Sequence, residues 1–162
     1  MGPNYNDRRN QPGSYQQNAG NRSRQQGETA WPTASEFKNE WIAQKLDSAC
    51  IAYAEKLGQY LVENKFTTSQ IRNVYGEIKR IQMKGFQQNK TPFLLLLPKM
   101  AYSAKRAKDK DRSEGASIFE SVMKKAHMAV EPDKDDSMRR FQNFCDFAEA
   151  VLAYHKANGG RD

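Results

Sequence analysis

The chain has 162 residues, of which 38% are hydrophobic and 28% are charged, enough for one domain with a core and hardly enough for two. Its two cysteines and two histidines show no CxxC or HExxH spacing, and no glycine-rich phosphate loop occurs, which argues against a disulfide framework, a zinc site and a P-loop. The longest apolar run, 93–97, is too short to span a bilayer, and no secretory leader is recognisable. We expect a cytoplasmic protein with no cofactor, no metal and no membrane partner.

Residues 1–30 are predicted to form a disordered tail. Ten of these thirty residues are Asn or Gln, and the others are rich in Gly, Ser and Arg without apolar periodicity. Such a segment buries too little apolar surface to offset the entropy of ordering. Its arginines and tyrosines could contact nucleic acid, but a solubilising leader is the favoured interpretation. The Trp31-Pro32 step then marks the start of a single helical domain over residues 31–160.

Apolar periodicity predicts two helical segments between residues 35 and 63. Ser35 is the expected N-cap of the first segment, whose apolar stripe consists of Phe37, Trp41, Ile42 and Leu46. A break is expected near Asp47, after which a second helix continues to about Glu63. The chain should then turn at residues 64–65.

A central helix is predicted from residue 68 to about residue 86. Thr67 is its expected N-cap, and Gln70 three residues later completes a capping box. Phe66 before the cap and Ile71 within the first turn are placed for a hydrophobic staple. Apolar residues then recur at three- and four-residue steps and predict a core-facing stripe of Ile71, Val74, Tyr75, Ile78 and Ile81.

The next segment contains two prolines that predict a short helix, a kink and a second helix. Pro92 should occupy the first helical position, and the run 93–97 (FLLLL) is apolar all round and is expected to be buried. Pro98 should interrupt that helix, because proline removes a backbone donor and clashes one turn back. The following helix carries Lys99, Tyr102, Lys105 and Arg106, and residues 107–112 are expected to form a solvated loop.

Two further helices complete the prediction. Ser113 or a neighbour should cap a helix that ends at 131–133, with a stripe of Ile118, Phe119, Val122, Met123 and Ala126. Asp135 or Asp136 should cap the last helix, whose apolar positions are Phe141, Phe144, Ala148, Val151, Leu152 and His155. Asn158-Gly159-Gly160 is a strong stop signal. We therefore predict an all-α fold, a compact bundle of five or six helices.

Positive charge is concentrated in one part of the chain. Residues 67–110 contain ten Lys or Arg and only two acidic residues, Glu77 and Asp109, a net charge of +8 when the whole chain has +7. A concentrated cationic patch suggests a polyanion, most often nucleic acid. A merely solvated helix face is the alternative, although ordinary surfaces intersperse both signs.

The candidate contacts follow from this window. Phosphate could be reached by Arg72, Lys79, Arg80 and Lys84 on one helix and by Lys99, Lys105 and Arg106 on the next. Gln70 and Asn73 can hydrogen-bond ribose or phosphate, and Tyr102 can stack on a base. Gly76 would allow close approach of a backbone, with tight helix–helix packing as an equally good interpretation. His127 and His155 lie on helical patterns and are better read as core or rim residues than as catalytic groups.

Three blocks resemble the small helical subunit of type III-A CRISPR effector (Csm) complexes. They are TTSQIRNVYGEIKRI at 67–81, LLPKMAYSAKR at 96–106 and FCDFAEAVLAYHKANGG at 144–160, and the resemblance covers about 45–160. It implies a helical bundle without catalytic activity, stacked in several copies along the guide RNA–target RNA duplex inside a ribonucleoprotein for antiviral defence. The implied partners are guide (crRNA) and target RNA, other subunits of the complex and copies of the chain itself.

Carried over residue by residue, the resemblance implies RNA contacts at Gln70, Arg72, Lys79, Arg80, Lys99, Tyr102 and Arg106, and less closely at Gly76 and Lys105. Two alternatives remain open from the sequence. One is a protein-interaction module whose basic face docks an acidic partner. The other is a ribonuclease that uses His127 or His155 with nearby lysines.

Overall fold

The computed structural model describes Gly2 and residues 31–108 and 113–161. These residues form α1 (Asn39–Ala43), α2 (Ser48–Glu63), α3 (Thr68–Lys84), the 3-10 turn η1 (Phe86–Gln88), α4 (Lys90–Leu94), α5 (Leu96–Lys108), α6 (Ser113–Met128) and α7 (Ser137–Ala157). The predicted all-α bundle is confirmed: the long helices have 13 to 21 residues, and α1 and α4 have 5 each. The predictions for 3–30 and 109–112 concern residues outside the described ranges.

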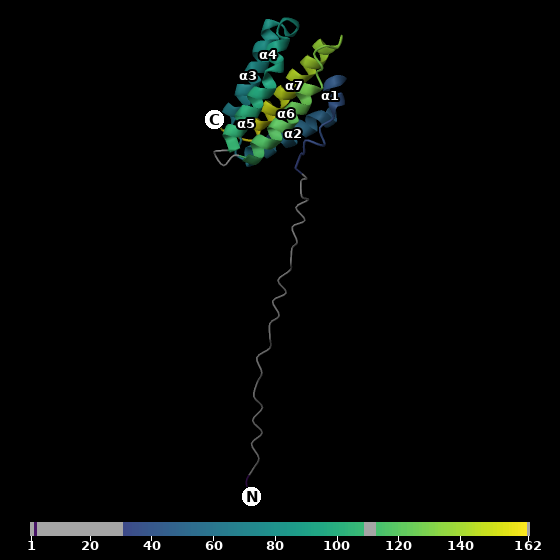
Figure 1. Cartoon of the computed structure of the whole chain (residues 1–162). Helices are drawn as coiled ribbons and strands as arrows, with labels where there is room; N and C mark the ends of the chain where they lie inside the picture. The colour runs from purple at the N-terminus through teal and green to yellow at the C-terminus, as the bar shows by residue number, and fades with distance from the viewer. Residues whose placement is uncertain (1, 3–30, 109–112, 162) are drawn as a thin grey trace.

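The 21-residue helix α7 is the element against which much of the bundle packs (Figure 1). α2 runs parallel to it, and the two helices pack tightly where Gly58 faces Tyr154. α3 runs antiparallel to α7, because the start of α3 meets the end of α7 while Gln82 donates to Gln142 at 3.0 Å near the other end. α5 then packs between α3 and α6, on the side away from α2.

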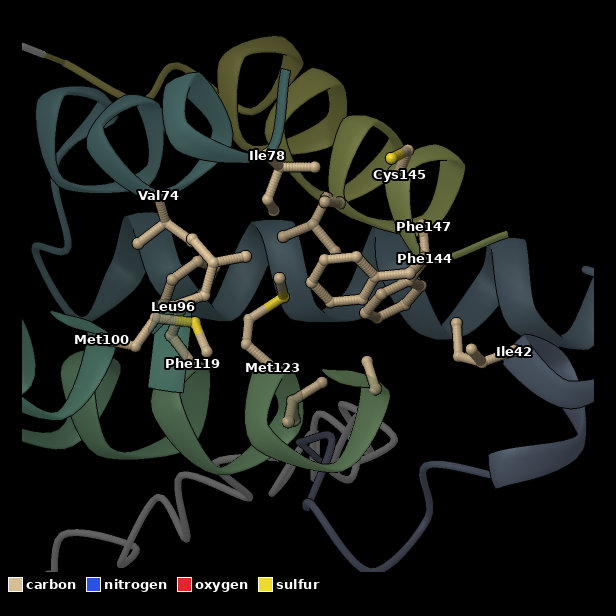
Figure 2. Packing of buried hydrophobic residues seen from close by; sticks show 14 of the residues in the cluster. Ile42, Val74, Ile78, Leu96, Met100, Phe119, Met123, Phe144, Cys145 and Phe147 are labelled. Carbon is tan, nitrogen blue, oxygen red and sulfur yellow. The ribbon is translucent and has the colours of Figure 1, made fainter. Parts of the chain in front are cut away.

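The core is one continuous cluster in which aromatic rings dominate the end of the bundle near α4. The rings of Phe86 and Phe141 stack with centroids 4.3 Å apart, and Phe93 stacks on the imidazole of His127 at 3.9 Å. Figure 2 shows side chains from α3, α5, α6 and α7 meeting in this interior, with Phe144 and Phe147 at its centre. Dense apolar contact of this kind fixes how the helices sit against one another.

Both histidines belong to this interior, as predicted. His127 is 3% exposed and its Nε2 lies 2.7 Å from the Phe93 carbonyl oxygen, while His155 is fully buried with Nε2 2.6 Å from the Phe66 carbonyl oxygen. In each case burial lowers the imidazole pKa, and the bonded carbonyl opposes that change. In both residues Nε2 therefore bonds a main-chain carbonyl in the interior rather than solvent.

The observed helix starts test the N-caps and the helix break that the sequence predicts. The capping box at α3 is confirmed: Thr67 N donates to Gln70 Oε1 at 2.8 Å, and Gln70 N donates to Thr67 Oγ1 at 3.3 Å. The expected break near Asp47 is also confirmed, since its carboxylate caps α2 by accepting from Cys50 N. The prediction for Ser35 was wrong. α1 begins at Asn39, and the Ser35 hydroxyl instead bonds Thr33 within a preceding turn.

The prediction that the whole run 93–97 is buried was also wrong. Phe93 and Leu96 are buried, but Leu94 is 52% exposed and Leu95 is 49% exposed. The helix break falls at Leu95, before Pro98, so Pro98 lies in the first turn of α5, where its missing N–H costs nothing. Pro92 is likewise the third residue of α4 rather than the first. Within α4 only Phe93 is buried, so this helix lies on the surface of the bundle with one face toward the core.

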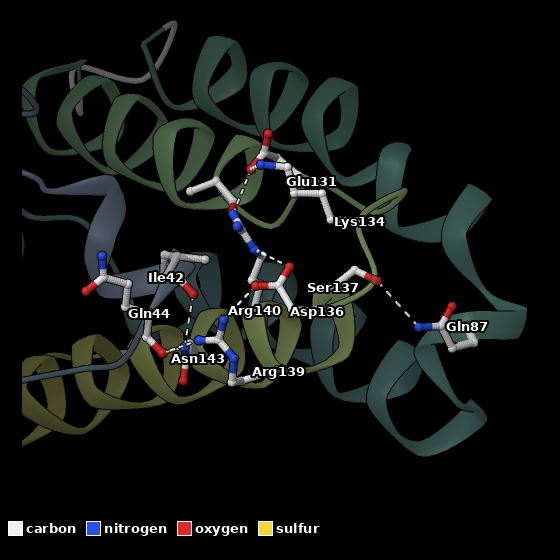
Figure 3. Close-up of polar contacts among 11 residues, drawn as sticks. Ile42, Gln44, Gln87, Glu131, Lys134, Asp136, Ser137, Arg139, Arg140 and Asn143 are labelled. Atoms are coloured by element: carbon white, nitrogen blue, oxygen red, sulfur yellow. Dashed lines mark hydrogen bonds and ion pairs between the residues drawn. The ribbon is translucent and has the colours of Figure 1, made fainter.

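The end of the bundle where α6 passes into α7 is closed by charged side chains, drawn in Figure 3. We call Glu131, Asp136, Arg139 and Arg140 the α6–α7 corner. Arg140 donates to Asp136 at 2.8 Å, to Glu131 at 2.6 Å and to the Ala129 carbonyl at 3.1 Å. Asp136 occupies the predicted N-cap position of α7 but makes no side-chain cap bond, because its carboxylate is used by the two arginines.

The two thiols, Cys50 and Cys145, are free and buried on α2 and α7. Burial raises the pKa of each thiol to about 12. In the described part of the chain, no helix combines the length and apolar character that crossing a membrane requires.

Candidate nucleic-acid interface

A groove of about 350 Å³ runs between α3 and α5, within the most basic part of the chain. We call it the α3–α5 groove. α3 contributes Asn73, Val74 and Glu77, and α5 contributes Leu96, Lys99, Met100, Tyr102 and Ser103. Its floor is apolar and its rim is polar, which suits a ligand that presents charge outward and a flat apolar face inward.

The α5 side of the groove carries an aromatic residue between two cations. Tyr102 is 65% exposed, and Lys99 and Arg106 lie three residues before it and four after it, so the three share one face of the helix. The Arg106 guanidinium lies 5.9 Å from the Tyr102 ring centroid. Lys105 is exposed as well and is three residues after Tyr102, so it flanks the ring on the side opposite Lys99, about 100° around the helix from Arg106.

Across the groove, Glu77 of α3 joins two of the predicted contacts. Its Oε2 accepts from Lys99 Nζ at 2.6 Å and from Arg80 Nη2 at 2.9 Å. These two bonds, from Lys99 first and Arg80 second, hold the Glu77 pKa below its usual value. Sequence reasoning missed this residue, although a signal was available: Glu77 is one of only two acids between residues 67 and 110.

Lys79 lies on the other side of α3, toward α7. Its Nζ is 3.3 Å from Glu149 Oε2 and 3.1 Å from Gln82 Oε1, and it lies 5.4 Å from the Tyr75 ring centroid. Tyr75 also donates to Glu149, at 3.0 Å. Arg72, two turns earlier on α3, is exposed. The predicted contacts are therefore divided: Arg80 bonds Glu77 on the groove side of α3, whereas Lys79 is directed to α7.

Gly76 lies on the exposed surface of α3, and a Cβ placed there would meet nothing within 4 Å. The interpretation of tight helix–helix packing is therefore wrong for Gly76. That role falls to Gly58, where a Cβ would come within 2.7 Å of the His155 backbone nitrogen. Gly76 is open to an approaching backbone, as the alternative interpretation requires.

Gln70 caps the start of α3, because its Oε1 accepts hydrogen bonds from both the backbone N–H and the hydroxyl of Thr67. It is half-buried at the start of α3 and remains within reach of the surface. Among the residues that the structure describes, no group of three His, Cys, Asp or Glu side chains could hold a metal ion. The two histidines are buried away from the groove and bonded to main-chain carbonyls.

Comparison with known proteins adds one finding to this geometry. A family model described as Csm2 Type III-A matches residues 44–161, well over half of the 162-residue chain. No curated protein and no solved structure matches the chain. The matched range contains α2 to α7, and so both helices of the α3–α5 groove. The chain therefore belongs to the Csm2 family, the small subunit of the type III-A CRISPR (Csm) complex.

Proposed function

We propose that this chain is a non-catalytic structural subunit that binds RNA backbone inside a type III-A CRISPR ribonucleoprotein. Several copies line the channel that holds guide and target RNA, next to other subunits of the complex, and act in the cytoplasm in antiviral defence. Family membership supports the place in the complex. The surface of α3 and α5 supports the contact with RNA.

The observation that carries this proposal is the row of exposed groups along the α3–α5 groove. Lys99, with a side chain 52% exposed, and Arg80, 43% exposed, both bond Glu77 beside it, and Arg106 continues the row past Tyr102. Lysine and arginine bind phosphate without reading base sequence, and an exposed tyrosine stacks on any base. A subunit that must accept every guide needs such contacts.

The test is binding of the full-length protein to fluorescent single-stranded RNA, measured by anisotropy across a salt series. About five phosphate contacts predict a log–log slope of roughly −3 to −4 for the native protein. The variant Arg80→Gln/Lys99→Gln/Arg106→Gln removes three contacts and should reduce the magnitude of that slope by about two. Circular dichroism should show unchanged helicity.

A matched control removes the same charge elsewhere. Lys45→Gln/Lys56→Gln/Lys125→Gln alters three exposed lysines outside α3 and α5 and should leave the slope near its native value. Equal loss in both variants would show that binding depends on net charge alone. Strong preference for one short sequence motif would contradict a backbone-binding role. Absence of RNA binding by every variant, in a preparation without excess absorbance at 260 nm from bound nucleic acid, would favour an acidic protein partner instead.

Contacts with other subunits need a different surface, and exposed apolar side chains supply a candidate. Leu94 and Leu95 are about half exposed at the end of the bundle near α4. Exposed apolar groups of this size suit burial against a neighbouring protein. This proposal predicts that Leu94→Ser/Leu95→Ser impairs assembly of the purified complex while RNA binding by the free chain is unchanged.

A further inference from the structure

Glu77 is the one acidic residue among the eight that line the α3–α5 groove. Its side chain is 32% exposed, and a single carboxylate oxygen accepts both short bonds, from Lys99 and from Arg80. One donor comes from α5 and the other from the next turn of α3. Lys99, which lines the groove, and Arg80, which lies next to it on α3, therefore converge on one negatively charged oxygen in the free protein.

That arrangement has the same donors that a phosphate oxygen would require. An ammonium and a guanidinium at 2.6 and 2.9 Å from one oxygen give charge-assisted bonds of normal length. Asn73, one turn before Glu77, lines the same groove and adds an amide. The oxygen position is accordingly defined by the surrounding donors, whichever anion supplies the oxygen.

We propose that Glu77 occupies the phosphate position of the α3–α5 groove in the free protein and competes with the RNA backbone for Lys99 and Arg80. This inference rests on the proposed function, and it names the residue that limits affinity at the same site. Glu77 acts through the two cations and is not itself an RNA-binding group.

Two electrostatic effects determine whether Glu77 weakens or strengthens RNA binding. If the carboxylate stays when a phosphate enters, the two negative charges repel at a separation of about 4 Å, which in water weakens binding about five-fold and more in a partly buried groove. If the carboxylate leaves, two ion pairs must break before the phosphate can replace them. The carboxylate therefore weakens RNA binding in either case.

The test compares full-length wild type and Glu77→Gln by anisotropy with a short single-stranded RNA and with DNA of the same sequence. Glu77→Gln should bind RNA about five-fold or more tightly than wild type. The effect should disappear in the Arg80→Gln/Lys99→Gln background, because no cation is then left to compete for. Glu55→Gln on α2, which packs on α6 and α7, makes the same change in net charge and should alter affinity less than two-fold.

Three other results would each overturn the inference about Glu77. If wild type binds RNA and Glu77→Gln binds no more tightly than Glu55→Gln, the inference fails while the proposed function stands. If Glu77→Gln loses RNA binding but keeps DNA binding, the carboxylate accepts a bond from the ribose 2′-hydroxyl, and the inference is again overturned. If neither wild type nor Glu77→Gln binds RNA, the RNA-binding function fails together with the inference.

Discussion

The α3–α5 groove and the α6–α7 corner use the same residue types in opposite ways. In the corner, Arg140 has a side chain only 12% exposed, and its donors are divided between Asp136, Glu131 and a main-chain carbonyl. In the groove, Lys99 and Arg80 share one carboxylate and stay about half exposed. Arginines and acids that are fully paired with one another link neighbouring elements of the fold. A surplus of exposed cations instead leaves a positive electrostatic potential at the surface.

The corner also shows why geometry matters more than charge count. The planar guanidinium of Arg140 bonds groups from the end of α6, the following loop and the start of α7 at once. Lys99 reaches one partner on the neighbouring helix with a single flexible ammonium. The first arrangement should contribute to stability, and the second should be easy to exchange for a ligand.

The largest expected effect on stability is in the corner. Arg140→Ala should lower the free energy of unfolding by roughly 2–3 kcal/mol, because it removes several charge-assisted hydrogen bonds from a nearly buried side chain. Urea denaturation measures this loss, and RNA binding should not change. Lys134→Ala, which removes a 53% exposed side chain paired with Glu131, serves as the control and should cost less than about 1 kcal/mol. Equal costs for the two variants would show that the nearly buried bonds of Arg140 contribute no more to stability than an exposed ion pair.

Substitutions of two helix glycines compare a position packed in the interior with one on the proposed RNA-binding surface. Gly58→Ala should destabilise the fold by about 1–3 kcal/mol, since its Cβ would come within 2.7 Å of the α7 backbone. Gly76→Ala should stabilise it by about 0.5–1 kcal/mol, because this helical position is open. Thermal unfolding of both variants checks the opposite signs. Weaker RNA binding by the more stable Gly76→Ala would support close approach of the RNA backbone.

As the pH falls, protonation of the buried histidines should lower the free energy of unfolding before protonation of the α6–α7 corner carboxylates does. Burial lowers the pKa of His127 and His155 below the ordinary value of 6.5, so the unfolded chain takes up protons first as the pH falls. Stability should therefore be level above pH 6.5 and fall below it, by at most about 1.4 kcal/mol per pH unit for each histidine. The pKa values of the Glu131 and Asp136 carboxyls are lowered in the folded chain. Their contribution to the free energy of unfolding should therefore be lost only as the pH falls below about 4, the ordinary pKa of free carboxyl groups. Denaturant titrations at pH 7, 6 and 5 test this, and equal stability at all three would contradict it.

The smallest expected effect is a difference in RNA affinity between variants on the two sides of α3. Lys79→Gln should reduce RNA affinity about two-fold, while Lys99→Gln should reduce it about five-fold, because only Lys99 lies in the groove. Anisotropy at low salt distinguishes the two values. A larger loss for Lys79→Gln would move the binding surface to the face between α3 and α7.

Much of the fold is encoded in short stretches of sequence, and those parts could be predicted. The capping box needs only Thr67 and Gln70, and the stop after α7 needs only Gly159, whose φ of +87° disfavours other residues. The stripe of α3 follows from its spacing. Each of these signals lies within a few residues, so the sequence is sufficient to read it.

The parts that failed depend on distant partners. Glu77 meets Lys99 across 22 positions, and no local pattern indicates which side of α3 faces α5. Lys79 and Arg80 are neighbours in sequence, yet Lys79 pairs with Glu149 of α7 while Arg80 pairs with Glu77 of its own helix. The exposure of Leu94 depends on where α4 breaks and on how that short helix lies on the bundle. Family resemblance supplied the candidate site residues, but it could not supply the side chains that they contact in the free protein.

The buried thiols have a practical consequence for site-specific labelling. Maleimides and other alkylating reagents attack thiolates, and a thiol with a pKa of about 12 inside the core is almost entirely protonated at pH 7. Cys50 and Cys145 should therefore stay unmodified while the protein is folded. A cysteine introduced at Tyr102 or Gly76 would then be the reactive one, without removal of either native residue. A fluorophore attached there would report directly on the surface where RNA is expected to bind.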